Sequence, residues 1–183
     1  MSRSFIMLWL LALAPLAVAA PRDWQVDYPR SQIRFVIQQM NVPVEGGVKR
    51  FSATARFDPV KPETGVFRVE LDMASVDTGS PDGDGEAQRP LWFDVGRHPR
   101  AVFVSRAVKK QPDGRYMASG DLTIKGRTRA VNVPFTLVRH SGESWLAEGR
   151  LPVSRADFGI GGGDWNDVVA DRAEARFRIW LKP

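Results

Sequence analysis

The residues that could do acid–base, nucleophilic or metal chemistry are few in this chain of 183 residues. There is no cysteine, which excludes disulfide frameworks, thiolate zinc sites and cysteine nucleophiles. The two histidines, His98 and His140, lie far apart, and neither has a ligand-like neighbour. No GxSxG, GxxxxGK or HExxH motif occurs. The sequence therefore favours a binding or structural role, and an enzyme is not expected.

Two glycine-containing runs partly match the spacing of ligand-binding loops. Asp82, Asp84 and Glu86 alternate with other residues, as carboxylates do in calcium loops, but the sixth-position glycine and closing glutamate of an EF-hand are missing. The glycine run at 161–163 lacks GxGxxG spacing and a following helical pattern. It is expected to bend the backbone beside Trp165. No metal ion and no resident cofactor are expected.

The elements that would position any site are β-strands. Apolar and polar residues alternate with a period of two through most of the chain, and no long helical repeat occurs. The pattern predicts about eight antiparallel strands in one domain, as a barrel or a sandwich, and closure into a barrel would remove exposed edges. Residues 77–99 break the pattern, and 86–94 are expected to form a short helix or an irregular lid that Pro90 limits.

Small side chains on the inward faces bear on whether the interior is filled or hollow. A solid core would need more volume at these positions, so an internal cavity is predicted. Large residues from facing strands could instead fill the gaps, and that alternative stays open. The small inward residues are Ala53, Ala55, Ala118, Gly120, Ala173 and Ala175.

The first residues have the pattern of a secretory signal peptide. Arg3 is followed by an apolar run at 5–13 and by the small-x-small cleavage signal at 17–19. An uncleaved membrane anchor is disfavoured, because the whole apolar stretch at 5–20 is shorter than the roughly 20 residues that span a membrane and contains Pro15. The predicted organisation is a signal peptide at 1–19 and one β-barrel domain at 20–183.

The net charge of +5 is mildly basic for a chain of this length. Basic residues cluster at 49–50, 109–110 and 125–129, each beside turn residues. Solvated hairpin ends explain these clusters best, and attraction to an anionic headgroup or membrane surface is the alternative. Because the chain is expected to be exported, no nucleic acid partner is expected.

Several motifs, taken in order, resemble the YceI-like family. The resemblance runs from about Trp24 to Leu181, nearly the whole expected mature chain. The motifs are WQVD at 24–27, WFD at 92–94 with HP at 98–99, FVS at 103–105, GDLTIKGRT at 120–128, RADFGI at 155–160 and VAD at 169–171. The resemblance implies a lipocalin-like, eight-stranded antiparallel β-barrel in the bacterial periplasm. It also implies a polyisoprenoid, quinone or other long lipid as ligand.

The candidate ligand-binding residues are large apolar side chains expected to face inward and aromatic side chains expected near an entrance. Each could also be a plain core residue. The Trp92–Phe93 pair is the strongest candidate because it lies in the irregular segment, where a lid is expected. The expected lining is Phe35, Ile37, Phe67, Val69, Leu122, Phe135, Phe158, Ile160 and Phe177, and the expected entrance residues are Trp92, Phe93 and Trp165.

Two functions of different classes follow from these observations. The leading hypothesis is a periplasmic protein that holds an isoprenoid, polyprenyl or quinone-like lipid inside its barrel for transport, storage or scavenging. The alternative is a structural or partner-binding barrel that serves a membrane redox or stress system. Transient membrane contact and a homodimer stay open as further partners in either case.

Overall fold

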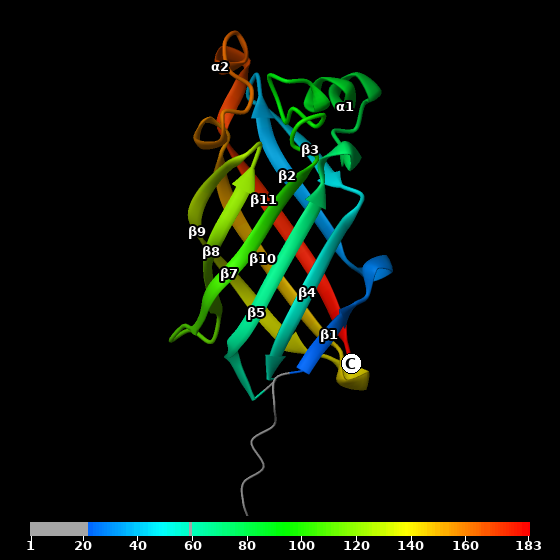
Figure 1. The fold of residues 1–183 in the computed structure, drawn as a ribbon, viewed down its shortest axis with the longest axis vertical. Helices are drawn as coiled ribbons and strands as arrows, with labels where there is room; N and C mark the ends of the chain where they lie inside the picture. The colour runs from blue at the N-terminus through cyan, green and yellow to red at the C-terminus, as the bar shows by residue number, and fades with distance from the viewer. Residues whose placement is uncertain (1–21, 59) are drawn as a thin grey trace, which may run out of the picture.

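The computed structural model describes residues 22–58 and 60–183, which form mainly antiparallel β-sheet (Figure 1). The predicted signal peptide at 1–19 lies outside the described residues. The strands are β1 (Arg22–Val26), β2 (Gln32–Gln39), β3 (Val42–Val48), β4 (Phe51–Asp58), β5 (Lys61–Asp72), β6 (Val76–Asp77), β7 (Arg100–Lys110), β8 (Tyr116–Ile124), β9 (Arg127–Arg139), β10 (Trp145–Ser154) and β11 (Val169–Lys182). The helices are α1 (Pro81–Gln88) and α2 (Trp165–Val168), and single 3-10 turns form η1 (Tyr28–Arg30), η2 (Met73–Ser75), η3 (Ser141–Glu143) and η4 (Ala156–Phe158).

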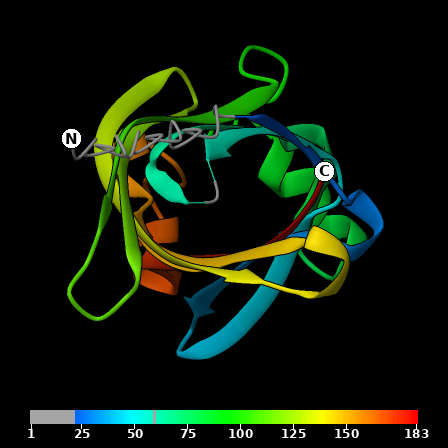
Figure 2. The same ribbon diagram turned by 90° about the horizontal axis from the view of Figure 1, so that it is seen from below.

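The strands close into one barrel with eight positions around its wall (Figure 2). Three positions are each shared by two consecutive strands: β1 with β2, β3 with β4, and β5 with β6. Strand β11 closes the ring, because it pairs with β2 over most of its length and with β1 at its end. The predicted eight-stranded antiparallel barrel is therefore confirmed, and β1, β3 and β6 are strands that the alternation did not predict.

The period-two alternation explains which face of each strand is inside. On β5, Phe67 and Val69 face the interior and Arg68 and Glu70 face solvent, where Glu70 pairs with Arg68 and with Arg100 of β7, each at 2.6 Å. The pKa of Glu70 is lowered by hydrogen bonds from these two arginines. Such exposed ion pairs set the outer face and contribute little stability, so burial of the inner face is the main force that holds the wall together.

The end of the barrel that carries β1 and the C-terminus, here called the base, is sealed by aromatic side chains. Trp24 and Phe57 stack with ring centroids 4.9 Å apart, and Trp145 meets both edge-on. The indole N–H of Trp24 donates to the Phe57 carbonyl at 3.2 Å, so its polar atom is satisfied inside the core. Phe57 is fully buried. Among the described residues, aromatic packing therefore fills the base.

The opposite end, here called the cap, consists of the β6–β7 and β10–β11 connections (Figure 1). Helix α1 begins after Ser80, whose hydroxyl accepts the Gly83 N–H at 3.1 Å, and it has Pro81 in its first turn. A short helix is thus present at 81–88, and residues 89–94 are irregular, which was the other expectation for the segment 86–94. The Ser-Pro start signal fixes the helix earlier in the chain, and residues beyond Gln88 form turns because Pro90 prevents its continuation.

Candidate ligand cavity and its cap

An apolar cavity of about 170 Å³ lies in the middle of the barrel. All the side chains that line it are apolar except Thr54 and Arg176. Strands β2, β4, β5 and β7 to β11 all contribute to the wall. Five of the candidate residues line this cavity: Phe67, Val69, Leu122, Phe135 and Phe177.

Small residues make the space, as the inward alanines led us to expect. Ala53, Ala55, Ala118 and Ala175 line the cavity, whereas Gly120 and Ala173 do not. The candidate set lacked several of the lining residues. Phe103 stands on β7 in one of the sequence motifs, and its alternation with Ala101 could have identified it. The further lining residues outside that set include Ile33, Leu71, Ala101, Phe103, Ala147 and Leu151.

Two phenylalanine rings lie over glycines on the neighbouring strand. Phe177 is the direct partner of Gly149, and Phe35 is the direct partner of Gly46. A Cβ at Gly46 would stand 2.3 Å from the Phe35 ring, so the missing side chain is what lets the ring lie flat on β3. Phe35 packs against the buried cluster that contains Met73 and, from α1, Ala87, and it does not line the cavity. Ile37, one inward position further toward the cap, does not line it either.

We expect Gly149→Ala to lower ligand affinity by displacing the Phe177 ring. The new Cβ would stand 2.5 Å from both the ring and the Pro134 carbonyl oxygen. Because the carbonyl belongs to the wall, the ring has to move inward, which reduces the cavity and costs about 1–3 kcal/mol of stability. Thermal melts and titration with the apolar dye N-phenyl-1-naphthylamine measure both effects. An unchanged dye affinity would contradict this account of the ring.

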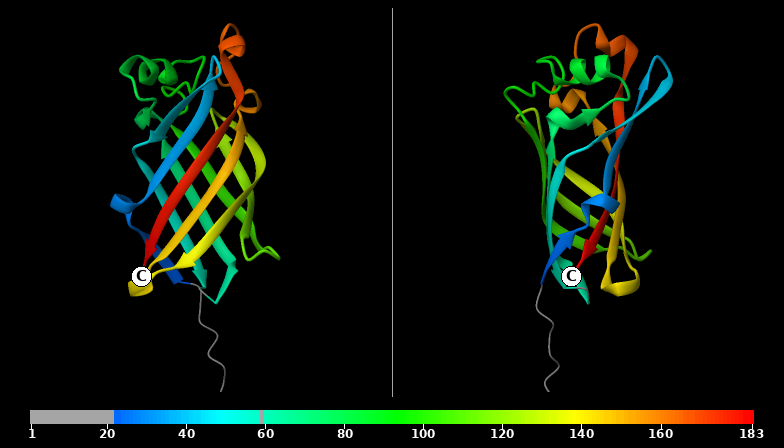
Figure 3. Two further views of the ribbon diagram at one scale, coloured as in Figure 1. Left: turned by 180° about the vertical axis from the view of Figure 1, so that it is seen from behind. Right: turned by 90° about the vertical axis from the view of Figure 1, so that its right-hand side faces the viewer.

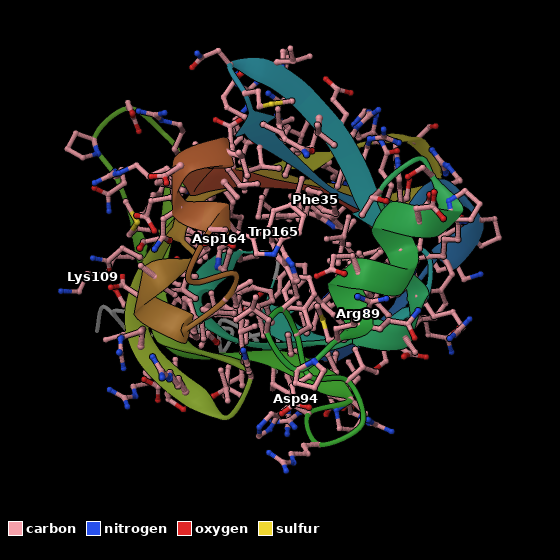
Figure 4. The ribbon with its side chains drawn as sticks, turned by 90° about the horizontal axis from the view of Figure 1, so that it is seen from above. Phe35, Arg89, Asp94, Lys109, Asp164 and Trp165 are labelled. Carbon is pink, nitrogen blue, oxygen red and sulfur yellow. The ribbon has the colours of Figure 1, made fainter. Side chains whose placement is uncertain are left out.

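The other five candidate residues form the cap and not the cavity wall. Phe158 and Ile160 are buried with Leu122, and Trp92 and Phe93 pack against this cluster. The Trp165 ring meets Trp92 edge-on with centroids 5.2 Å apart. Seen from this end, Trp165 and Phe35 lie toward the middle of the barrel mouth, whereas Asp94 lies toward its edge (Figure 4). The cap therefore closes the cavity through aromatic packing.

The indole N–H of Trp92 is buried and has no hydrogen-bond partner among the described residues. Leaving such a donor unpaired costs about 1–3 kcal/mol. We therefore expect Trp92→Phe to keep the free energy of unfolding within about 1 kcal/mol of the wild type, since lost contact area offsets the removed penalty. Trp92→Ala removes the ring altogether and is expected to cost about 3–5 kcal/mol. Urea unfolding of both variants would test the difference, and similar losses would contradict it.

A buried arginine holds the second cap connection in shape. Arg155 is only 6% exposed, and its guanidinium donates to six oxygens of the segment that follows it. The contacts include the Ile160 carbonyl at 2.9 Å and the Val169 carbonyl at 2.7 Å. The planar fork suits several carbonyls at once. This role was not predicted from the sequence, although Arg155 begins one of the motifs.

Lys125 connects the two cap segments to each other. Its ammonium donates to the Leu91 carbonyl at 3.1 Å and to the Gly159 carbonyl at 2.7 Å. The Gly161 N–H also donates to the Leu91 carbonyl, at 2.8 Å. Burial lowers the pKa of Lys125, and the charge of Asp94 opposes that shift. The two segments of the cap are thus held together by hydrogen bonds as well as by aromatic packing.

The described part of the chain contains no group of three or more His, Asp or Glu side chains that could hold a metal ion. Within residues 22–58 and 60–183, no helix is long and apolar enough to cross a membrane.

Comparison with known sequences finds relatives that align with most of the chain. The chain is 32% identical over 164 residues to a UPF0312 protein of Pseudomonas savastanoi pv. phaseolicola, covering 83% of this chain and 85% of that protein. It is 29% identical over 161 residues to protein YceI of Escherichia coli O157:H7, covering 82% of each.

Solved structures show the same barrel. BcnA of Burkholderia cenocepacia superposes with a TM-score of 0.81 at 37% identity, covering 85% of this chain and 99% of BcnA. A domain of Saccharophagus degradans, described as polyisoprenoid-binding and implicated in plant cell wall breakdown, superposes with a TM-score of 0.68 at 13% identity, covering 87% of this chain and 97% of that domain. At that identity the likeness shows the fold alone. The model of the YceI-like domain matches residues 24–181, so the chain belongs to the YceI-like family.

Proposed function

We propose that this protein binds an apolar, chain-like lipid in its barrel and carries, stores or scavenges it without chemical conversion. The observation that carries the proposal is the central cavity of about 170 Å³ with its nearly all-apolar wall. Such a wall binds through burial, and each methylene removed from water contributes about 0.8 kcal/mol. The described polyisoprenoid binding of the Saccharophagus degradans domain supports the ligand class.

The size of the cavity sets what the closed barrel holds. An apolar cavity of about 150 Å³ accepts a benzene molecule, so this cavity accommodates a short apolar segment. A long polyprenyl chain fits only if the cap or the wall moves. We therefore propose that the bound part of the ligand is a short length of a longer molecule, such as one end of an isoprenoid tail.

The proposed place of action is the periplasm. The basis is the pattern of residues 1–19, which has a positive start, an apolar run and a small-x-small cleavage signal. A protein exported in this way would meet lipids that leave either membrane. Fractionation of cells that express the full chain, with detection of the processed form, would test this location.

Extraction and titration test the function directly. Protein purified without detergent is extracted with organic solvent, and the extract is analysed by mass spectrometry. The protein is then titrated with geraniol, farnesol and solanesol, isoprenoid alcohols of increasing length, in competition with N-phenyl-1-naphthylamine. We expect a co-purifying lipid and displacement of the dye by at least the shorter alcohols. No extracted lipid together with no dye uptake would overturn the proposal.

One observation favours the second candidate, a scaffold barrel that binds a protein partner. Aromatic clusters close both ends, and Trp24, Phe57 and Phe158 are almost completely buried. A barrel that is permanently closed would act through its outer surface. The dye titration separates the two candidates, because a permanently closed barrel takes up no dye.

A further inference from the structure

A gap in the barrel wall, here called the seam, lies between residues 27–32 and residues 49–54. Below it, β1 pairs with β4 up to Trp24 and Ala55. Above it, β2 pairs with β3 from Ile33 and Val48 onward. In the described part of the chain no strand pairing joins the two sides between these points. A long hydrogen bond crosses the gap, from the Ala53 N–H to the Tyr28 hydroxyl at 3.4 Å.

Each side of the seam is held by hydrogen bonds to a part of the chain that lies away from the gap. The η1 turn projects from the side of the barrel (Figure 3, left) and is tied to β11. The Asp27 N–H donates to the Trp180 carbonyl at 2.8 Å, and the Trp180 N–H donates to the Ser31 hydroxyl at 2.9 Å. On the opposite side, the N–H groups of Lys49 and Arg50 donate to Ser75. The two sides can therefore part without breaking these anchors.

The wall at the seam separates the cavity from the outer surface. A groove of about 530 Å³ lies outside it, and among the described residues Ile33 alone borders both the groove and the cavity. Phe51 also lines the groove and meets Tyr28 edge-on at 5.5 Å. Ile33 thus stands between the groove and the cavity, and Phe51 packs against the same core cluster as Ile33. Opening the cap instead would break the bonds of Arg155 and Lys125.

The groove is polar, but its charges are already paired. Lys49 pairs with Asp77 at 2.8 Å, and Arg34 pairs with Glu45 at 3.8 Å. Arg50 pairs with Asp72, also at 2.8 Å. A charged head would have to compete with these partners, whereas an uncharged oxygen needs only a free donor. The Ala53 N–H becomes such a donor when the Tyr28 ring swings out.

We propose that an amphiphilic ligand enters through the seam and keeps its apolar tail in the cavity and an uncharged, oxygen-bearing head in the groove. The head is a hydroxyl, an ester or a ring carbonyl. This inference rests on the proposed function, because it assumes that the cavity takes an apolar tail. It adds the route of entry and the class of the head.

A disulfide across the upper edge of the seam tests the route. Ile33 and Val48 are direct partners, so the double variant Ile33→Cys with Val48→Cys can form one, and the chain has no other cysteine. We expect oxidation to slow both binding and release of N-phenyl-1-naphthylamine about tenfold, with little change in Kd, because only the route is blocked. Reduction should restore both rates. Stopped-flow fluorescence measures them.

The matched control places the same crosslink on another part of the wall. Ser119 and Asn132 are direct partners on β8 and β9, with their side chains hydrogen-bonded at 2.7 Å. Oxidation of Ser119→Cys with Asn132→Cys should leave the dye rates unchanged. Equal rates for the oxidised and reduced seam variant would overturn entry through the seam while leaving the proposed function standing. A wild type that takes up no dye would overturn both.

A series of heads on one tail tests the groove. Farnesol, farnesoic acid and farnesylamine share a tail and differ in the charge of the head. We expect farnesol to displace the dye about tenfold more tightly than either ion, which corresponds to about 1.4 kcal/mol. Farnesoic acid or farnesylamine as the tightest binder would overturn the uncharged head. Tyr28→Phe should weaken the Ala53 contact and speed dye entry, and an unchanged rate would count against the gap as the route.

Discussion

Filling the cavity from one wall position, with Ala147→Phe, is expected to abolish most ligand binding and leave the barrel folded. Ala147 lines the cavity, and its direct partners are Leu137 and Ile179. A phenyl ring is the size of the benzene that an apolar cavity of about 150 Å³ accepts. The introduced ring would therefore take nearly all of the 170 Å³ that the wild type leaves empty.

The expected loss of affinity follows from the methylene groups of the ligand that no longer fit into the cavity. Excluding about two methylenes, at about 0.8 kcal/mol each, lowers the affinity for farnesol at least about tenfold. The effect on stability is small, because filling a void gains about 24 cal/mol per Å³ and the strain of a tight fit costs about 1–3 kcal/mol. Dye competition and thermal melts of the ligand-free protein measure the two quantities.

A matched change on the outer face separates cavity filling from a general effect of the larger side chain. Ala107 is exposed on β7, so Ala107→Phe should leave farnesol affinity unchanged. Wild-type affinity in the Ala147→Phe variant would show that the ligand binds elsewhere. A variant that loses binding only because it has unfolded would be recognised by its melt.

The wall of the barrel was predictable because its signal is local. On β5 the alternation of Phe67, Val69 and Leu71 with charged residues fixes the inward face, whatever the neighbouring strands are. The inward alanines likewise predicted a hollow centre, since a cavity needs missing volume. The start of α1 also has a local signal, because Ser80 caps the helix and Pro81 stands in its first turn.

The cap and the seam were not predictable, because contacts between distant residues determine them. Phe35 alternates as a wall residue should, and Gly46 on the neighbouring strand decides where its ring lies. The break between β1 and β2 depends on the hydrogen bond that Ser31 accepts from Trp180, 149 positions away. No pattern within one strand shows such partners. Strand β3, at 42–48, was also not predicted, because Gly46 and Gly47 weaken the alternation of apolar and polar side chains that indicates a strand.

Loss of the Arg155 guanidinium is expected to destabilise the protein as much as any single substitution in the cap. Arg155→Met keeps much of the apolar stem but removes the donors to six oxygens, four of which belong to Ile160, Gly161, Trp165 and Val169 carbonyls. Hydrogen bonds to a charged group contribute about 1.5–3 kcal/mol each. Because water can reach part of the collapsed segment, we expect a net loss of about 3–5 kcal/mol.

This loss of stability should be detectable in the cap at lower temperature than in the wall. A change of 1 kcal/mol shifts Tm by about 2–4 °C in a domain of this size, so Tm should fall by about 10 °C. Hydrogen exchange should speed up first at 156–170, since those amides depend on the loop that Arg155 organises, and the strands of the wall should follow only near the melt.

Two further substitutions show whether the effect belongs to the planar guanidinium of Arg155. Arg150→Met is the matched control, because the Arg150 side chain is 70% exposed and its guanidinium lies 3.9 Å from Glu174, and such pairs contribute little. Arg155→Lys keeps the charge but not the planar fork, so it should fall between the wild type and Arg155→Met. Both methionine variants melting at the wild-type temperature would contradict this role of Arg155. The cap would then be held by its aromatic packing and by Lys125 alone, and it could open as easily as the seam.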